Sequence, residues 1–251
     1  MLFEQVLGKN SAWLIAHADE CVSAEARSAF AVLAARRARG EPMAYILGER
    51  EFYGLELRVT PAVLIPRPET ELLVERALER IPENAASRVL DLGTGSGAIA
   101  IALAKARPRA QLTAVDVDYA ALGVARENAR RHGVEVRFFC GDWYGPLAAE
   151  TFDLIVSNPP YVAEGDPHLA LGDVRFEPRR ALLGGADGLD CIRAVIAGAK
   201  RHLRSGAWLL FEHGYDQAEA CRALLQGEGY AAAQTWPDLA GIARVSGARR
   251  D

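Results

Sequence analysis

The 251-residue sequence has few of the features that mark disulfide-rich, metal-binding or membrane proteins. Its four cysteines, Cys21, Cys140, Cys191 and Cys221, show no paired spacing, so neither a disulfide framework nor a zinc site is indicated. The five histidines form no metal-like cluster, and we expect no bound metal. This cysteine usage is typical of a reducing cytoplasm, which is the predicted location.

Long apolar runs and an excess of positive charge are also missing. No apolar run approaches the roughly 20 residues that span a bilayer, and the amino terminus lacks the pattern of a signal peptide, so we expect no membrane association. The net charge of -4 argues against broad nucleic-acid binding, because such binding depends on Lys and Arg contacts to phosphate. With half of its residues hydrophobic, the chain has room for one full core and a small second unit.

The residue patterns divide the chain into three parts. Residues 1–41 are predicted to form a small helical domain. Residues 42–87 are predicted to form a connector with a short hairpin about Gly54, a proline-rich segment and a helix from about Glu69 to Arg80. Residues 88–251 are predicted to form the second, larger domain.

The larger domain begins with the first half of a nucleotide-binding βαβ unit. A predicted strand, Val89–Leu92, leads into the glycine-rich turn Gly93–Gly97 and then into the apolar helix Ala98–Ala106. Glycines let the backbone approach a ligand closely, and the start of a helix offers free N–H groups. The next strand, Gln111–Val115, ends in Asp116, at about the offset of ~20 residues at which an acid accepts both hydroxyls of a ribose.

The spacing of the glycine turn favours one class of cofactor. Gly93-Thr94-Gly95-Ser96-Gly97 reads G-x-G-x-G, unlike the typical dinucleotide fingerprint or the phosphate loop, and no lysine follows to meet phosphates. S-adenosylmethionine, which has ribose and adenine but no pyrophosphate, therefore fits this turn better than NAD or ATP.

A third strand, Val136–Cys140, leads into Asp142 and Trp143. Ligands of doubly wound sheets bind at the carboxyl ends of the strands, so Asp142 can bind an adenine amino group and Trp143 can lie against the ring. Core filling is the alternative role for Trp143. The residues expected to hold the cofactor are Gly93, Thr94, Gly95, Ser96, Gly97, Asp116, Asp142, Trp143 and Asn158.

The motif Asn158-Pro159-Pro160-Tyr161 follows the apolar strand pattern Phe152–Ser157. Two consecutive prolines end a strand. Asn158 then offers an amide that donates and accepts, Pro159 a carbonyl that only accepts, and Tyr161 a flat ring. This set suits a planar group that carries an NH2, although four such residues also form ordinary turns. We expect all four to bind the substrate, and Asn158, Pro159 and Tyr161 to be catalytic.

About 26 residues without clear periodicity follow Tyr161, and a loop of this length is usually functional or disordered. Its segment Asp173–Pro178 is a candidate substrate lid, with a solvated charged loop as the alternative. Beyond it, the pattern predicts a helix from Ile192 to Leu203, a strand from Trp208 to Phe211, a further helix and two final strands near Tyr230–Trp236 and Ile242–Val245. The predicted fold class is therefore α/β.

Taken together, these motifs resemble the HemK-type protein-glutamine methyltransferases. The resemblance covers almost the whole chain, except that such proteins usually carry a further helix before the segment that begins here at Leu2. The motifs that carry the resemblance are Gly48–Phe52, Leu64–Glu71, Asp91–Gly97, Ser157–Tyr161, Gly172–Pro178 and Glu212–Gly214.

The resemblance implies a Rossmann-like S-adenosylmethionine-dependent methyltransferase domain whose final strand is antiparallel, preceded by a helical substrate-docking domain and a hairpin connector. It further implies that S-adenosylmethionine is bound by Gly93–Gly97, Asp116, Trp143 and Asn158, and that residues 158–161 hold the substrate glutamine. The expected partners are peptide chain release factors, with S-adenosylhomocysteine as the second product and methylation of the glutamine of a Gly-Gly-Gln motif as the reaction.

Two alternatives to this reaction remain open at the level of the sequence. An amino-group methyltransferase acting on adenine or guanine in DNA or RNA can use the same four-residue motif, but it needs a basic face or a recognition insertion that this acidic chain lacks. The second alternative is a non-catalytic binding module, and the intact glycine turn and Asp116 count against it.

Overall fold

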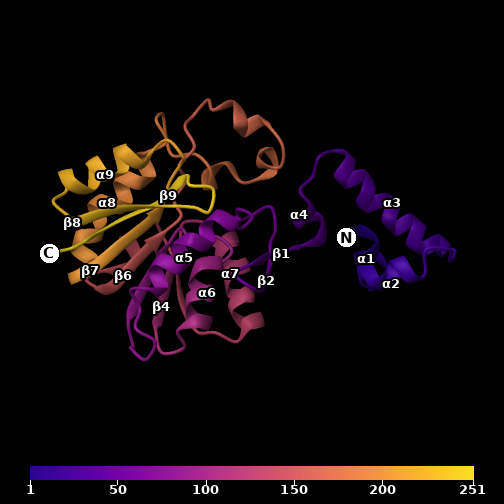
Figure 1. Cartoon of the computed structure of the whole chain (residues 1–251), viewed down its shortest axis with the longest axis horizontal. Coiled ribbons are helices and arrows are strands. Elements are labelled where there is room, and N and C mark those ends of the chain that lie inside the picture. The colour runs from indigo at the N-terminus through magenta and orange to yellow at the C-terminus, as the bar shows by residue number, and fades with distance from the viewer.

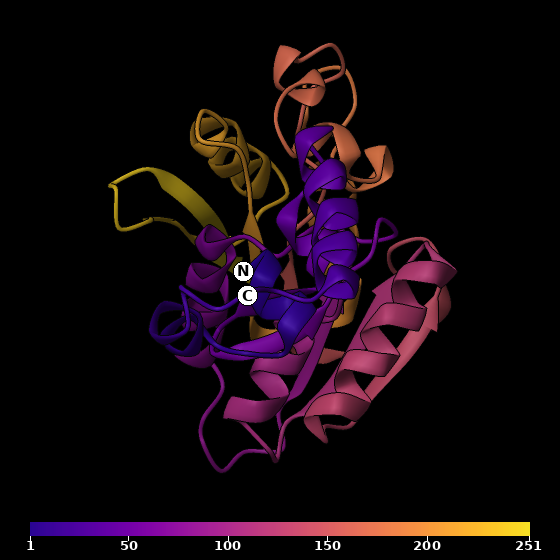
Figure 2. The same cartoon turned by 90° about the vertical axis from the view of Figure 1, so that its right-hand side faces the viewer.

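The computed structural model describes all 251 residues and begins with a helical unit that projects from the rest of the molecule (Figure 1). The rings of Phe3 and Phe30 stack with centroids 4.0 Å apart and join its first and third helices, yet no residue of the three helices is buried. Figure 2 looks onto this unit from outside. Its helices are α1 (Leu2–Leu7), α2 (Ser11–Ala16) and α3 (Ala24–Ala38).

A segment with a hairpin, here called the connector, follows the helical unit, and the hairpin lies about Gly54 as predicted. The two residues of the hairpin turn, Tyr53 and Gly54, have φ angles of 52° and 72°. Two successive positive φ angles match the right-handed twist of the paired strands, so the turn closes without splaying them. The connector elements are α4 (Met43–Leu47), β1 (Glu49–Phe52), β2 (Leu55–Arg58), the 3-10 turn η1 (Pro68–Thr70) and α5 (Glu71–Leu78).

The larger domain is built on a seven-stranded sheet with the order β5-β4-β3-β6-β7-β9-β8. The first five strands of this order are parallel, whereas β9 pairs antiparallel with both β7 and β8. Because the chain runs outward from β3 to β5 and then returns to β6, the strand order reverses between β3 and β6. The strands are β3 (Arg88–Leu92), β4 (Gln111–Asp116), β5 (Val136–Cys140), β6 (Phe152–Ser157), β7 (Leu203–Glu212), β8 (Ala231–Pro237) and β9 (Ala243–Arg249).

Helices cover the two faces of the sheet and bury two separate cores. Along β3, Val89 packs into the core beneath α5 and α6, and the next residue, Leu90, packs into the core beneath α8 and α9. This alternation follows the two-residue period of a strand that is buried on both faces. The helices are α6 (Ala98–Ala106), α7 (Tyr119–His132), α8 (Asp190–His202) and α9 (Ala218–Gly227). None of the helices is long and apolar enough to cross a membrane.

The structure confirms the predicted fold class and corrects several element boundaries. The strand predicted to begin at Trp208 begins at Leu203, because the polar, exposed residues 204–206 hide its start from a hydrophobicity pattern. The last strand continues to Arg249 instead of Val245. The predicted helix Glu69–Arg80 begins as the 3-10 turn η1 and ends at Leu78.

A buried asparagine of α7 joins the connector to the glycine turn. The Asn128 side chain accepts a hydrogen bond from the Arg58 N–H at 2.7 Å and donates to the carbonyl oxygens of Arg58 at 3.0 Å and Ser96 at 2.9 Å. All of its amide hydrogen-bonding atoms are thus used inside the protein, where an unpaired polar group is costly. Asn128 therefore ties β2 to the turn that follows β3.

We expect the substitution Asn128→Ala to lower the free energy of unfolding by about 3 kcal/mol, because it removes the partners of three backbone groups of Arg58 and Ser96, of which that of Ser96 is buried. Urea denaturation followed by circular dichroism measures this change. The exposed Asn84→Ala is the matched control and should stay within about 0.5 kcal/mol of the unsubstituted protein. Equal stability of the two variants would contradict the bridging role.

Candidate functional site

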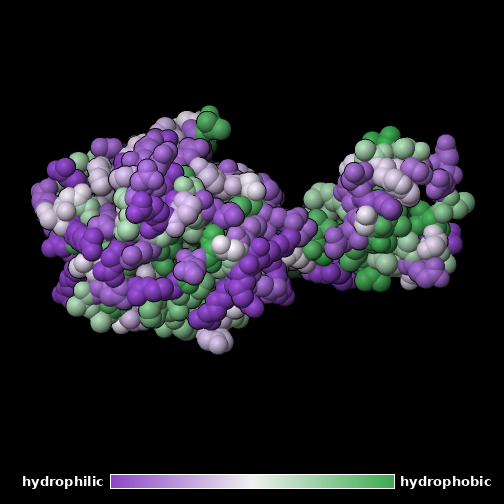
Figure 3. Space-filling view, turned by 90° about the horizontal axis from the view of Figure 1, so that it is seen from below, coloured by the Kyte–Doolittle hydropathy of each residue, from purple (hydrophilic) through white to green (hydrophobic).

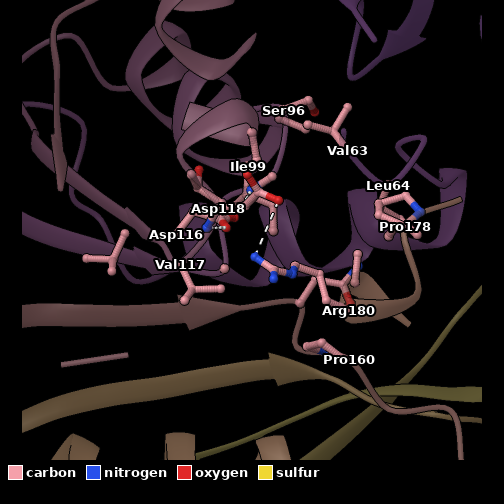
Figure 4. A pocket seen from close by; sticks show the side chains of 18 of the residues that line it. Val63, Leu64, Ser96, Ile99, Asp116, Val117, Asp118, Pro160, Pro178 and Arg180 are labelled. Atoms are coloured by element: carbon pink, nitrogen blue, oxygen red, sulfur yellow. Dashed lines mark hydrogen bonds and ion pairs between the residues drawn. The ribbon is translucent and has the colours of Figure 1, made fainter. Parts of the chain in front are cut away.

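A cavity of about 280 Å³ opens at the carboxyl ends of β3, β4, β5 and β6, beside the point where the strand order reverses (Figure 4). Such a crevice is where open α/β sheets bind their ligands. The structure brings together at this cavity most of the residues predicted from the sequence, namely Gly93, Thr94, Gly95, Ser96, Asp116, Asp142, Trp143, Asn158 and Pro160.

The register of β3 and β6 places the glycine turn beside the Asn-Pro-Pro-Tyr motif. Leu92 is paired with Ser157, and the Ser157 hydroxyl donates to the Leu92 carbonyl oxygen at 2.8 Å. The next residue of each strand therefore also lies side by side, and a Cβ added to Gly93 would come 4.0 Å from the carbonyl oxygen of Asn158. The turn and the motif are thus two walls of one cavity.

The glycines of the turn have different roles. Gly93, Gly95 and Gly97 have φ angles of 70°, 55° and 84°, in the left-handed region that favours glycine. Gly95 has open space where a Cβ would be, so the backbone there is accessible to a ligand. Gly97 does not line the cavity: a Cβ would lie 2.9 Å from Ile101 and 3.2 Å from Ala125, so this position serves helix packing.

Asp116 lies at the end of β4 with its carboxylate held by the backbone. One oxygen accepts from the Gly95 N–H at 2.8 Å and the other from the Asp118 N–H at 2.8 Å. Burial raises the pKa of Asp116, and these two hydrogen bonds lower it in part. Since each carboxylate oxygen has a second lone pair, the side chain keeps two acceptor positions for a diol.

The far wall of the cavity combines polar and apolar surface. Asp142 is exposed, and Trp143 is half-buried with a φ of 43°, a left-handed conformation that is uncommon for a large residue. Sequence reasoning missed Ile99 and Val117, which line the same cavity; 55% of Val117 is exposed. The position of Val117 directly after Asp116, the acid predicted to bind a ribose, was the available signal.

These residues fit S-adenosylmethionine. Asp116 offers paired acceptors for a ribose diol, Asp142 an acceptor for an amino group, and Ile99 and Val117 apolar surface for a flat ring. No lysine lines the cavity, and its two arginines are engaged with carboxylates. Arg67 pairs with Glu177, and Arg180 reaches Asp118 at 3.5 Å (Figure 4). The cavity thus offers acceptors and apolar surface but no free cationic side chain, and this matches a cofactor without a pyrophosphate.

Asn158 is held from behind by a buried group of side chains. Its Nδ2 donates to the Thr70 hydroxyl at 3.0 Å, and that hydroxyl donates to Glu212 Oε2 at 2.6 Å. The Tyr161 hydroxyl donates to the other Glu212 oxygen at 3.0 Å. Glu212 is 1% exposed, and burial raises its pKa despite these two donors.

Two members of this group, Thr70 and Glu212, were not among the site residues predicted from the sequence. Both lie in motifs that carry the family resemblance, which was the available signal. Pro159 is buried and does not line the cavity, and Tyr161 directs its hydroxyl to Glu212. The predicted contacts of Pro159 and Tyr161 with a substrate amide therefore remain predictions.

The candidate lid segment Asp173–Pro178 contacts both the connector and the helical unit. Glu177 is buried, accepts a hydrogen bond from the Ile65 N–H at 3.1 Å and pairs with Arg67. Arg175 donates to the Arg39 carbonyl at 3.1 Å, and Asp173 pairs with Arg37. The segment is thus anchored at one end beside the cavity and at the other against α3.

Comparisons with known proteins agree with this geometry. Residues 69–184 match the family model described as methyltransferase small domain, and residues 1–48 match the PrmC N-terminal domain. A release factor glutamine methyltransferase of Bordetella pertussis is 54% identical over 98% of this chain and 92% of its own length. The chain belongs to the release factor glutamine methyltransferase family. The corresponding protein of Burkholderia pseudomallei is 52% identical over 99% of this chain and 90% of its own.

This family membership confirms the resemblance inferred from the sequence motifs. Among solved structures, the fold is similar to that of a Thermus thermophilus 16S rRNA N2 G1207 methyltransferase in complex with AdoMet and guanosine, with a TM-score of 0.60. That similarity covers 81% of this chain and 50% of the other at 24% identity, and it shows the fold alone. The fold by itself therefore does not distinguish a protein substrate from an RNA substrate.

A further buried carboxyl, Asp91, lies next to the glycine turn. Asp91 is fully buried at the end of β3, and its Oδ2 accepts from the Thr94 hydroxyl at 2.7 Å while its Oδ1 has no hydrogen-bond partner. Burial raises the pKa of Asp91 to about 7. The folded protein therefore binds a proton here at a pH where the unfolded chain does not.

This proton makes the stability of the protein depend on pH. Between the ordinary pKa of an aspartate and about 7 the folded state holds the extra proton, so stability falls as the pH rises through this range and levels off above it. From pH 6 to pH 8 we expect Asp91 to account for a loss of about 1.3 kcal/mol. Urea unfolding of the unsubstituted protein and of Asp91→Asn at both pH values measures it, and an unchanged pH dependence in the variant would show that Asp91 is not the group responsible.

Proposed function

We propose that this protein transfers a methyl group from S-adenosylmethionine to the side-chain amide nitrogen of a glutamine in peptide chain release factors, at the glutamine of a Gly-Gly-Gln motif. Membership of the release factor glutamine methyltransferase family supports this reaction. The observation that carries it is the placement of Asn158 at the cavity with its NH2 engaged by Thr70, which leaves its carbonyl oxygen as an acceptor.

The cofactor supplies an electrophilic methyl group on a positively charged sulfur when it is bound. Asp116 binds the ribose hydroxyls, Asp142 the adenine amino group, and Val117 and Trp143 cover the ring. The open backbone at Gly95 allows the close approach that the ribose and methionine portions require.

The chain's own contribution to the transfer is the positioning of a weak nucleophile. The lone pair of an amide nitrogen is delocalised into its carbonyl group. Asn158 Oδ1 and the Pro159 carbonyl accept the two N–H bonds of the glutamine, hold its nitrogen toward the cofactor and favour a more tetrahedral atom. No base has to remove a proton before the attack, because the positively charged nitrogen loses its proton after the bond has formed.

The helical unit is proposed to dock the protein substrate in the cytoplasm. It stands apart from the larger domain across a narrow waist and shows hydrophobic surface (Figure 3). Two of its apolar side chains are largely exposed, Ile15 at 78% and Val32 at 61%. Exposed apolar surface of this kind is typical of protein-protein contact.

Mass spectrometry of release factor incubated with the protein and S-adenosylmethionine tests the reaction. We expect one added methyl group on the glutamine of the Gly-Gly-Gln tripeptide, and no transfer to DNA or RNA in parallel reactions. Asn158→Ala should lower kcat by about 10² to 10³, the effect of removing one preorganised polar contact from a transition state.

The exposed Asn84→Ala serves as its control and should retain normal activity. A methyl group found on nucleic acid, or normal activity of a folded Asn158→Ala variant, would refute the proposed reaction.

Docking by the helical unit has its own test. The pair of substitutions Ile15→Glu and Val32→Glu introduces charge into the apolar surface, and we expect it to raise KM for the release factor about tenfold, since each substitution removes a modest apolar contact. Cofactor affinity measured by calorimetry should not change. An unaltered KM would place the docking surface elsewhere.

A further inference from the structure

The hydrogen bonds behind Asn158 run in one direction. The Thr70 hydroxyl has a single proton, and at 2.6 Å it is donated to Glu212. Toward Asn158 the same oxygen can therefore act only as an acceptor. The Asn158 atom that meets it at 3.0 Å is Nδ2, which can only donate. An ionised Glu212 thus fixes the direction of the Thr70 hydroxyl, and the hydroxyl in turn favours the orientation of the Asn158 amide in which Nδ2 faces Thr70.

The Glu212 end of this chain of bonds is buried, whereas Asn158 faces the cavity. Glu212 and Thr70 are 1% and 4% exposed, so solvent does not compete for their hydrogen bonds. Both oxygens of Glu212 are used, one by Thr70 and the other by Tyr161. Hydrogen bonds in such a place are stronger than in water, and a wrongly oriented polar group is correspondingly costly.

An asparagine amide has two ends of similar size and opposite polarity. With Nδ2 fixed on Thr70, Oδ1 is the end left for a ligand in the cavity. If the amide turned over, Asn158 would present an NH2 to the NH2 of the substrate, and two donors would meet. The acceptor function of Asn158 thus depends on groups behind it.

We propose that Glu212, acting through Thr70, fixes Asn158 with Oδ1 toward the acceptor nitrogen and so makes the site selective for an NH2 group. Glu212 does not line the cavity, and Thr70 lines it beside Asn158. Both are positioning residues in this scheme, because their effect on the substrate is exerted through the orientation of Asn158. The inference rests on the proposed methylation of a glutamine amide and adds the residues that define the polarity of its binding site.

The direction of the chain of bonds requires Glu212 to be ionised. A proton on Oε2 would be donated to Thr70, and the Thr70 hydroxyl would then donate to Asn158 and favour the reversed amide. Burial raises the pKa of Glu212, Arg244 on β9 lowers it and Glu69 on η1 raises it, in addition to the hydrogen bonds from Thr70 and Tyr161. Activity should consequently fall as the pH drops through the pKa of Glu212.

The first test compares Thr70→Val, which keeps the shape but removes the hydroxyl, with Thr70→Ser, which keeps the hydroxyl. We expect Thr70→Val to lower kcat about 10- to 100-fold, the effect of losing the alignment of a reacting group. Cofactor affinity should stay within about twofold, and Thr70→Ser should restore most of kcat. Normal kcat in Thr70→Val would overturn the proposal.

Thr113→Val is the matched control for this pair. Thr113 is a buried threonine on β4 that does not line the cofactor cavity, and the same substitution there should leave kcat unchanged. An equal loss of kcat in Thr113→Val would show that the effect comes from general packing and would also overturn the proposal.

The second test uses pH. Tyr161→Phe removes one of the two hydrogen bonds that stabilise the charge on Glu212, so the pKa of Glu212 rises. We expect the acidic limb of the profile of kcat/KM against pH to move up by about one pH unit. A structural role alone would lower the whole profile without moving its limb. This test does not depend on the folding of Thr70→Val.

The third test needs no activity. In nuclear magnetic resonance spectra, the side-chain NH2 of Asn158 should exchange slowly with water, and in Thr70→Val it should shift and exchange at least tenfold faster. If the unsubstituted protein failed to methylate release factor but showed this dependence, the proposed function would fall and the positioning role would stand. Identical Asn158 amide signals in both proteins would overturn the positioning role itself.

Discussion

The site depends on the parallel pairing of β3 with β6. This pairing places the ends of two strands from distant parts of the sequence side by side. The glycine turn follows Leu92, and Asn158 follows its partner Ser157. The turn has the properties of a cofactor-binding wall, and the asparagine those of an acceptor for an amide. A shift of one residue in this register would turn each side chain to the opposite face of the sheet and separate the two walls.

Much of the fold and part of the site follow from local patterns in the sequence. The alternation of apolar strands with amphipathic helices is a local signal, and α6, β4 and β5 lie at the residues predicted for them. Asp116, Trp143 and Asn158 were placed at one cavity because strand ends of a parallel sheet meet at one edge. The start of β7 was missed because residues 204–206 are polar and exposed, and only Leu203 before them pairs with β6.

The support behind Asn158 could not be predicted in the same way. Thr70 and Glu212 are separated by 142 positions, and neither has a pattern that indicates the other. Their contact exists only because η1 of the connector packs over the end of β7. Likewise, the ion pair of Arg67 with Glu177 joins residues 110 positions apart, and a charge in a proline-rich stretch gives no hint of its partner.

The orientation of Asn158 also bears on what happens after the reaction. An unmodified glutamine amide has two N–H bonds, whereas the monomethylated product has one. In the proposed arrangement the product leaves one of the two acceptors, Asn158 Oδ1 or the Pro159 carbonyl, without a donor in a largely enclosed place. The two acceptors that bind the substrate NH2 therefore favour departure of the methylated product. They also disfavour a second methyl transfer, because the product cannot make both hydrogen bonds that hold the nitrogen in place.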